Sequence, residues 1–196
     1  MSAIKIVDYD PSWPALFETQ RAGIEKLIGD LIAEIHHIGS TSVVGLCAKP
    51  KLDIDAVLHS DDFIPEAIKC VKSAGGYAFH GDPYGDGMWT FARGFGSNGT
   101  RLYLCGPDNA THAKRIRFRD YLCAHPDAAA EYARLKRKLA AEANGDWDFY
   151  TGGKSNFVRT IVRLAAAAHA TQRSGNGGGR KIALGIADRD NTGRAG

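Results

Sequence analysis

The sequence predicts an α/β (α+β) fold, in which a twisted mixed β-sheet flanked by helices is followed by a helical C-terminal portion. Two observations lead to this prediction. Up to residue 105, short apolar runs bounded by Gly, Pro, Asp and Asn alternate with two segments of helical periodicity. From residue 109, the pattern changes to long helical segments. A sheet covered by helices is the arrangement that this order of elements favours.

Local patterns place the elements of the sheet portion. Residues 11–28 have amphipathic spacing and follow Asp10, a residue that suits a helix N-cap, so they are predicted to be a helix. Residues 62–74 form a second predicted helix, capped by Asp61 or Asp62 and ended by two glycines. Strands are expected at residues 4–7, 31–37, 51–58, 77–80, 88–93 and 101–105.

Three helices are predicted in the C-terminal portion. Residues 111–124 and 127–143 are separated by His125 and Pro126, where the proline ends the first helix. Residues 148–168 form the third, which starts either at Asp148 or only after Gly152 and Gly153. Residues 1–169 are therefore expected to be one domain, helical from about residue 109.

Residues 170–196 form a different kind of segment. They contain seven glycines, five basic residues and two acidic ones, a composition typical of a flexible Gly/Arg-rich tail. A folded extension or partner-binding strand at KIALGIA is the alternative. The chain carries a net charge of +3, and the tail alone accounts for it, since the body has 20 basic and 20 acidic residues. A neutral body argues against a general nucleic-acid surface.

Bulk composition narrows the class of protein further. A hydrophobic content of 44% and a charged content of 24% are ordinary for a soluble globular protein. No segment has the pattern of a signal peptide or a membrane span, so no membrane partner is expected. The four cysteines are widely spaced without a CxxC pair, which indicates neither a zinc site nor a disulfide framework. A cytoplasmic location is the simplest interpretation.

The segment IGSTSVVGLCAKPKLDIDAV carries the main functional signal. On a strand, Asp53 and Asp55 point to the same side, while Leu52, Ile54 and Ala56 point to the other. Two adjacent carboxylates repel each other unless a cation lies between them, and Mg²⁺ (or Mn²⁺) takes such oxygen ligands together with phosphate. The turn at Gly39 and Ser40 lets backbone N–H groups approach an anion. The pattern predicts a metal-assisted site for a nucleoside triphosphate.

The Gly-Ser turn followed by Asp-x-Asp on a strand resembles the nucleotidyltransferase superfamily, and the spacing here from Ser40 to Asp53 is 13 residues. More closely, the chain is similar to the GrpB (UPF0157) family, a small branch of that superfamily. The matching segments run in the family's order over roughly residues 4 to 165: VDYDPSWPALFE, IHHIGSTSVVGL, AKPKLDIDAV, IRFRDYLCAHPDAAAEYARLKRKLA and YTGGKSNFV. The resemblance implies a nucleotidyltransferase-like fold.

The candidate site residues fall into three groups. Asp53 and Asp55 are expected to be catalytic and to hold the metal. Candidates for binding the nucleotide phosphates are Gly39, Ser40, Thr41, Ser42, Lys49, Arg115, Arg119 and Lys154. Candidates for binding the substrate are Arg101, Tyr103 and His37.

Several of these residues have an alternative interpretation. The Ser and Thr residues also suit a helix N-cap, and Lys49 could belong to a loop that only sets the strand. Arg115 and Arg119 share a helix face, with Arg117 roughly opposite, and that face could instead be solvated, with Asp120 orienting Arg119. One of His36 and His37 is expected to pack inward.

One departure from the superfamily affects the predicted activity. Active members place a third carboxylate on a later strand, but the strand TRLYLC has none and carries Arg101 and Tyr103 on one face. Either two carboxylates suffice, or Asp82 or Asp86 completes the site, or the site binds a nucleotide without turning it over.

Two functions follow from the sequence. The first is a Mg²⁺-dependent nucleotidyltransferase that uses an NTP, ATP being the expected one, to modify or adenylate-activate a small-molecule acceptor. The second is a nucleotide- or phosphometabolite-binding module that has lost turnover. The nucleotide and the acceptor are the expected partners, and the sequence leaves a homodimer open.

Overall fold

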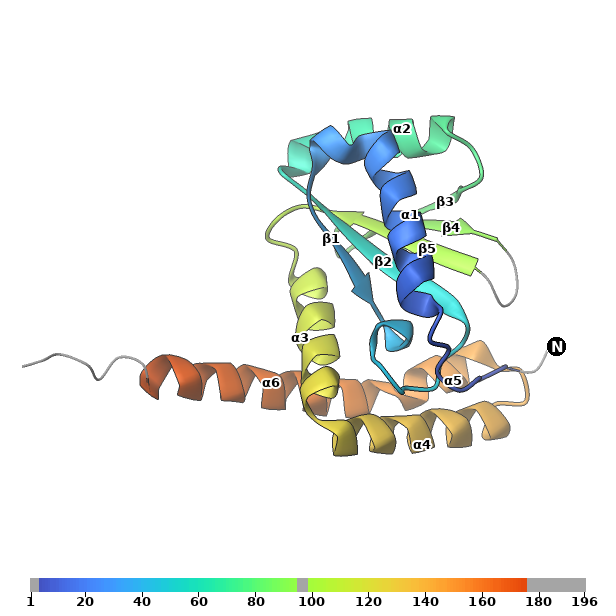
Figure 1. Ribbon diagram of the computed structural model, residues 1–196, viewed down its shortest axis with the longest axis vertical. Coiled ribbons are helices and arrows are strands. Elements are labelled where there is room, and N and C mark those ends of the chain that lie inside the picture. The colour runs from blue at the N-terminus through green and yellow to red at the C-terminus, as the bar shows by residue number, and fades with distance from the viewer. Residues whose placement is uncertain (1–3, 95–98, 176–196) are drawn as a thin grey trace, which may run out of the picture.

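A five-stranded mixed sheet forms the centre of the molecule, as predicted (Figure 1). The computed structural model describes residues 4–94 and 99–175, with side chains through residue 168. The strand order is β1-β2-β5-β4-β3, with β2 and β5 parallel and the other neighbours antiparallel. The strands are β1 (Ile32–Ile38), β2 (Lys51–Leu58), β3 (Ala78–Gly81), β4 (Trp89–Arg93) and β5 (Gly99–Cys105).

Helices cover both faces of the sheet. The first face carries α1 and α2, and the opposite face carries α3 (Figure 1). Among the other helices, α4 follows α3 along the chain, and α6 packs against α3. The helices are α1 (Trp13–Ile28), α2 (Ile64–Ser73), α3 (Ala110–Ala124), α4 (Pro126–Glu142), α5 (Trp147–Gly153) and α6 (Ser155–Gly175). No helix in the described part of the chain has the length and apolar character needed to cross a membrane.

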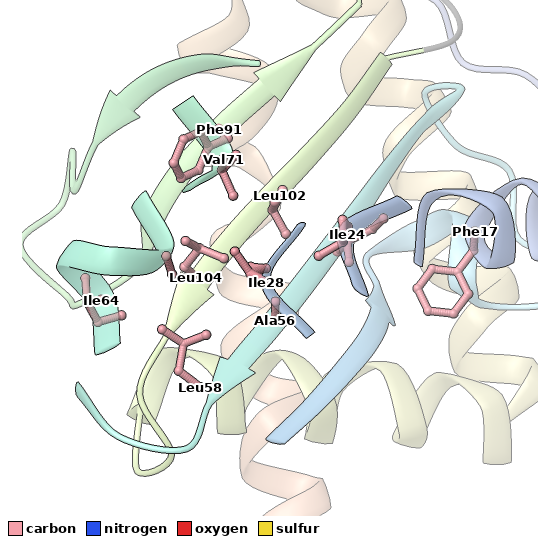
Figure 2. Close-up of a cluster of buried hydrophobic side chains, with 12 residues drawn as sticks. Phe17, Ile24, Ile28, Ala56, Leu58, Ile64, Val71, Phe91, Leu102 and Leu104 are labelled. Atoms are coloured by element: carbon pink, nitrogen blue, oxygen red, sulfur yellow. The ribbon is translucent and has the colours of Figure 1, made fainter. Parts of the chain in front are cut away.

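The core lies between the sheet and the first pair of helices (Figure 2). Ile54, Ala56 and Leu58 of β2 are fully buried there against side chains of α1 and α2. The predicted alternation along β2 is therefore confirmed, and it turns Asp53 and Asp55 toward the α3 side. Leu52, at the start of the strand, packs instead with Trp13 and Ala48.

Three local predictions differ from the structure. Residues 4–7 form no strand but one bridge, from Val7 to Ala48, because only this residue reaches a partner backbone. Helix α1 begins at Trp13, and Asp10 accepts the Ser12 N–H in the preceding turn. The 3₁₀ turn before α2 (Asp61–Phe63) is capped by Ser60, whose hydroxyl accepts the Asp62 N–H.

The third C-terminal helix is divided in two. Helix α5 ends at Gly153, and α6 begins at Ser155, with Lys154 between them. Helix α6 continues to Gly175, beyond the predicted boundary at residue 169. Most of the predicted tail, with its KIALGIA segment, lies outside the described residues, so its flexibility stays a prediction.

Two apolar clusters join the helical portion to the sheet portion. Val43 and Leu46, which follow the Gly-Ser turn, pack with Leu122 of α3 and Tyr132 of α4. Ile4 packs with residues of α4 and α5. These contacts hold the C-terminal helices over the end of β1 and the start of β2, where the candidate site lies.

Candidate functional site

The Gly-Ser turn between β1 and β2 is held tightly against Asp53. Gly39 has φ 74° and ψ −172°, a backbone conformation that residues with a side chain rarely adopt. A Cβ atom placed on Gly39 would lie 2.9 Å from Asp53 Oδ2. The Ser42 hydroxyl donates to the Gly39 carbonyl at 2.6 Å and closes the 3₁₀ turn Ser40–Ser42. Glycine is therefore required here both for backbone conformation and for space.

The two aspartates of β2 have different environments. Asp55 is fully buried, and both of its oxygens are occupied: Arg115 Nη1 donates to Oδ1 at 2.8 Å, and His112 Nδ1 lies 2.9 Å from Oδ2. Asp53 is only partly buried and contacts the Tyr103 hydroxyl at 3.4 Å. Asp55 thus positions Arg115, whereas Asp53 is the carboxylate that faces open space.

Asp53 lies in a strongly cationic environment. Burial raises the pKa of its carboxyl group, while the positive charges of Arg101, Arg115 and Lys49 act in the opposite direction. The repulsion from Asp55 is the smallest of these effects. Cations on several elements therefore converge on this one carboxylate.

A cavity of about 270 Å³ opens beside Asp53. Six cationic side chains and one carboxylate line it. The predicted site residues on its wall are Gly39, Ser40, Thr41, Lys49, Asp53, Arg101, Tyr103, Arg115 and Lys154. The polar and aromatic wall residues that were not predicted as site residues are Lys51, Phe118, Tyr132, Lys136, Tyr150 and Thr151. This excess of positive charge favours an anionic ligand.

Aromatic rings support three of the lysines. Lys154 Nζ lies 4.1 Å from the centre of the Tyr150 ring, and Lys49 Nζ lies 4.6 Å from that of Trp147. Lys136 is almost fully buried, lies over Tyr132 and donates to the Cys47 carbonyl. None of the three is paired with a carboxylate in the described part of the chain.

Burial also changes the protonation of these lysines. It lowers the pKa of Lys154 and that of Lys136 to about 8, and neighbouring cations, Lys49 foremost for Lys154, act in the same direction. Burial lowers the pKa of Lys49 as well. An anion entering the cavity would reverse this effect by stabilising the ammonium forms.

Four predicted residues lie outside the cavity wall. Asp55 is buried behind Arg115, and Ser42 is bound to the turn. Arg119 donates to the His37 carbonyl at 3.0 Å and pairs with Asp120 at 2.7 Å. His37 stacks on Phe17 and contacts the Thr41 hydroxyl at 2.9 Å, while burial and the charge of Arg119 lower its pKa to about 4. A neutral His37 therefore supports the turn from behind.

Comparison with known proteins places the chain in a family. The family model described as GrpB protein matches residues 3–164. The chain belongs to the GrpB family. A UPF0157 protein of Halalkalibacterium halodurans is 33% identical over 172 residues, which cover 85% of this chain and 84% of that protein. A UPF0157 protein of Bacillus subtilis is 30% identical over 174 residues, or 89% of this chain, which spans only half of that relative's length.

A solved structure shares the fold. The crystal structure of conserved protein GrpB from Enterococcus faecalis superposes with a TM-score of 0.76 at 24% identity. The match covers 84% of this chain and 99% of that one. The two chains therefore share their fold over most of this chain.

Signals for some of the missed residues are present in this GrpB sequence. Lys51 lies two positions before Asp53 on the same strand and so shares its face. His112 lies one helical turn before Arg115. Lys136 falls four residues after Tyr132 and three before Leu139, in the middle of the buried stripe of α4, where a lysine is unusual.

The residues of this GrpB protein fit a metal ion only in part. In the described part of the chain, no group of three or more His, Cys, Asp or Glu side chains is arranged to hold one. Asp82 accepts the N–H groups of Asp86 and Gly87, and Asp86 accepts the Thr111 hydroxyl, so neither joins the pair on β2. Asp53 remains as one carboxylate ligand, which suffices for Mg²⁺ when phosphate oxygens supply the others.

Proposed function

We propose that the cavity beside Asp53 binds the phosphate groups of a nucleotide, with ATP as the expected one. The observation that carries this proposal is the charge of the wall: six cationic side chains against a single carboxylate, next to the tight turn at Gly39. A volume of about 270 Å³ suits a chain of phosphates better than a whole nucleotide. The sugar and base would therefore extend out of this cavity.

Each group of wall residues has a distinct part in the proposal. Arg101 and Arg115 present planar guanidinium groups, which suit phosphate oxygens. Lys49 and Lys154 add point charges whose positions are fixed by aromatic rings. The hydroxyl of Ser40 and the backbone of the turn would bind the remaining oxygens.

Mg²⁺ (or Mn²⁺) fits this proposal through Asp53. The ion would be held by that carboxylate and by phosphate oxygens, and when bound it would neutralise charge on the phosphates. Asp55 supports the site indirectly, since it fixes Arg115 in place. The cations of the wall would hold the phosphates even without the ion, so we expect weaker but measurable binding in EDTA.

Calorimetry with the four NTPs, in the presence of Mg²⁺ or of EDTA, tests the proposal. We expect Lys154→Met to weaken binding about tenfold or more, because a charge-assisted hydrogen bond contributes about 1.5–3 kcal/mol. Lys138→Met is the matched control, since Lys138 is an exposed lysine of α4 that pairs with Glu142. Asp53→Asn should remove the effect of Mg²⁺ while leaving binding in EDTA intact. If no NTP binds under any condition, the proposal fails.

Nucleotidyl transfer is a second candidate function. The observation that favours it is the position of both aspartates on the same face of β2, with Asp53 packed against the Gly39 turn. An acceptor group would attack the α-phosphorus and release pyrophosphate, either in a transfer or in the adenylation of a carboxylate. Pyrophosphate release across a panel of small-molecule acceptors measures it. Nucleotide binding without release from any acceptor would leave the binding function alone.

A further inference from the structure

A second, larger cavity lies between α3 and α6. Its volume is about 580 Å³, within the range of small-molecule sites. It shares five wall residues with the first cavity: Arg115, Phe118, Tyr132, Thr151 and Lys154. The two spaces therefore adjoin, and a ligand that fills the second cavity would approach the proposed phosphate site.

The inner wall of this second cavity is apolar. Phe118 of α3 and Tyr132 of α4 meet edge to face, with ring centres 5.3 Å apart. Val158 and Val162 of α6 lie one helical turn apart on the same wall. These side chains can surround an aromatic or aliphatic group but offer it few hydrogen bonds.

The outer wall is basic and carries no acidic side chain. Lys114 of α3 and Arg163 of α6 form no ion pair in the part of the chain whose side chains are described, and Arg159 donates only to Asn156. All three are exposed. Because like charges gather here without a partner, a ligand with a negative group would relieve their repulsion.

We propose that this second cavity binds a small molecule with an apolar body and a terminal anionic group, such as a carboxylate, sulfonate or phosphate. The body would lie against Phe118 and Val162, and the anion would meet Arg159 and Arg163. The Gly/Arg-rich tail is a poor occupant, since its own net charge is +3. The inference does not depend on the nucleotide proposal. If the first cavity also carries out nucleotidyl transfer, the occupant of this cavity would be its acceptor.

A fluorescent probe tests the inference on the full chain. The probe 8-anilinonaphthalene-1-sulfonate has an aromatic body and one sulfonate, and its binding is followed by fluorescence and calorimetry. We expect about one probe per chain. Replacing both arginines, Arg159→Ala with Arg163→Ala, should weaken binding at least tenfold, and because both are exposed the variant will fold. Its matched control is Arg117→Ala, an exposed arginine of α3 that lies outside the cavity wall.

A second pair of variants tests the apolar wall. Val162→Asp places a negative charge inside the cavity and should also weaken binding at least tenfold. Leu164→Asp, two residues along α6 at a side chain that is 48% exposed and outside the wall, should change binding less than twofold. Circular dichroism confirms that each variant is folded.

Three results would overturn the inference. The first is that the wild type does not bind the probe, and the second is that the variants bind it as well as their controls do. The third is a change of oligomeric state in Val162→Asp but not in Leu164→Asp. That result would show that a second copy of the chain occupies the cavity. ATP titrations of the same proteins separate the two proposals. A wild type that binds the probe but no NTP would count against the nucleotide site alone.

Discussion

Replacing Gly39 with alanine tests whether the turn and Asp53 form one unit. Any residue other than glycine at φ 74°, ψ −172° costs about 1–3 kcal/mol in backbone strain. The added Cβ would also lie 2.9 Å from Asp53 Oδ2 and 3.3 Å from Asp53 Cβ, so one of the two segments must move by a few tenths of an ångström. Overpacking of this kind costs about 1–3 kcal/mol more. We expect Gly39→Ala to lower the free energy of unfolding by about 2–6 kcal/mol.

Gly45→Ala is the matched control for this substitution. Gly45 has φ 78°, but a Cβ placed on it would meet nothing within 4 Å, so the strain is present without the contact. Urea unfolding of both variants should show Gly39→Ala to be less stable by at least about 1 kcal/mol. Calorimetry with ATP and Mg²⁺ should show weaker binding only for Gly39→Ala, because only that change displaces Asp53. Equal stability and equal binding in the two variants would refute the reasoning.

Three further predictions concern the charged groups of the cavity. Asp55→Asn should lower the free energy of unfolding by about 2–4 kcal/mol, because it leaves Arg115 partly buried without its partner. Asp53→Asn should lower it by less than about 1 kcal/mol. The reverse order in urea unfolding would contradict the roles assigned to the two aspartates. Because the pKa of Lys154 is about 8, an anionic ligand should draw a proton onto the protein at pH 8. Calorimetry in two buffers of different ionisation enthalpy measures this uptake, which should fall in Lys154→Met. The folded pKa of Lys136, about 8, lies below that of an unfolded lysine, about 10.4, so the unfolded chain binds more protons between these pH values. The free energy of unfolding of the wild type, measured relative to that of Lys136→Met, should therefore rise by about 2–3 kcal/mol from pH 8 to 10.5. If this difference between the two proteins does not change with pH, Lys136 is not held in a desolvated position.

The pattern along β2 could be predicted because it is local. Alternation along one strand sets which side chains share a face, and the register of Asp53 and Asp55 follows from eight consecutive residues. The turn at Gly39 is likewise encoded by small residues next to each other in the sequence. The boundaries of α1 to α4 were predicted within two residues for the same reason, with Pro126 separating α3 from α4, whereas α6 runs to Gly175 instead of ending at residue 168.

The state of Asp55 could not be predicted from the sequence. Its partners His112 and Arg115 lie 57 and 60 residues away, and only the packing of α3 on the sheet brings them together. From the sequence, the two carboxylates on one strand indicated a metal ion between them. In the structure, Arg115 neutralises Asp55 instead. The burial of Lys136 depends in the same way on how α4 packs over the loop that contains Cys47.

The walls of the phosphate cavity come from two separate stretches of the chain. The turn, β2 and β5 supply one wall before residue 105, and α3, α4, α5 and Lys154 supply the other after residue 110. Exchanging the second stretch between relatives would therefore keep the strand-borne groups and replace the helix-borne ones. A chimaera built in this way should bind the anion only if the donor stretch supplies cations in place of Arg115, Lys136 and Lys154. It should then acquire the donor's preference for the organic part of the ligand, so ligand choice in such proteins can diversify without rebuilding the sheet.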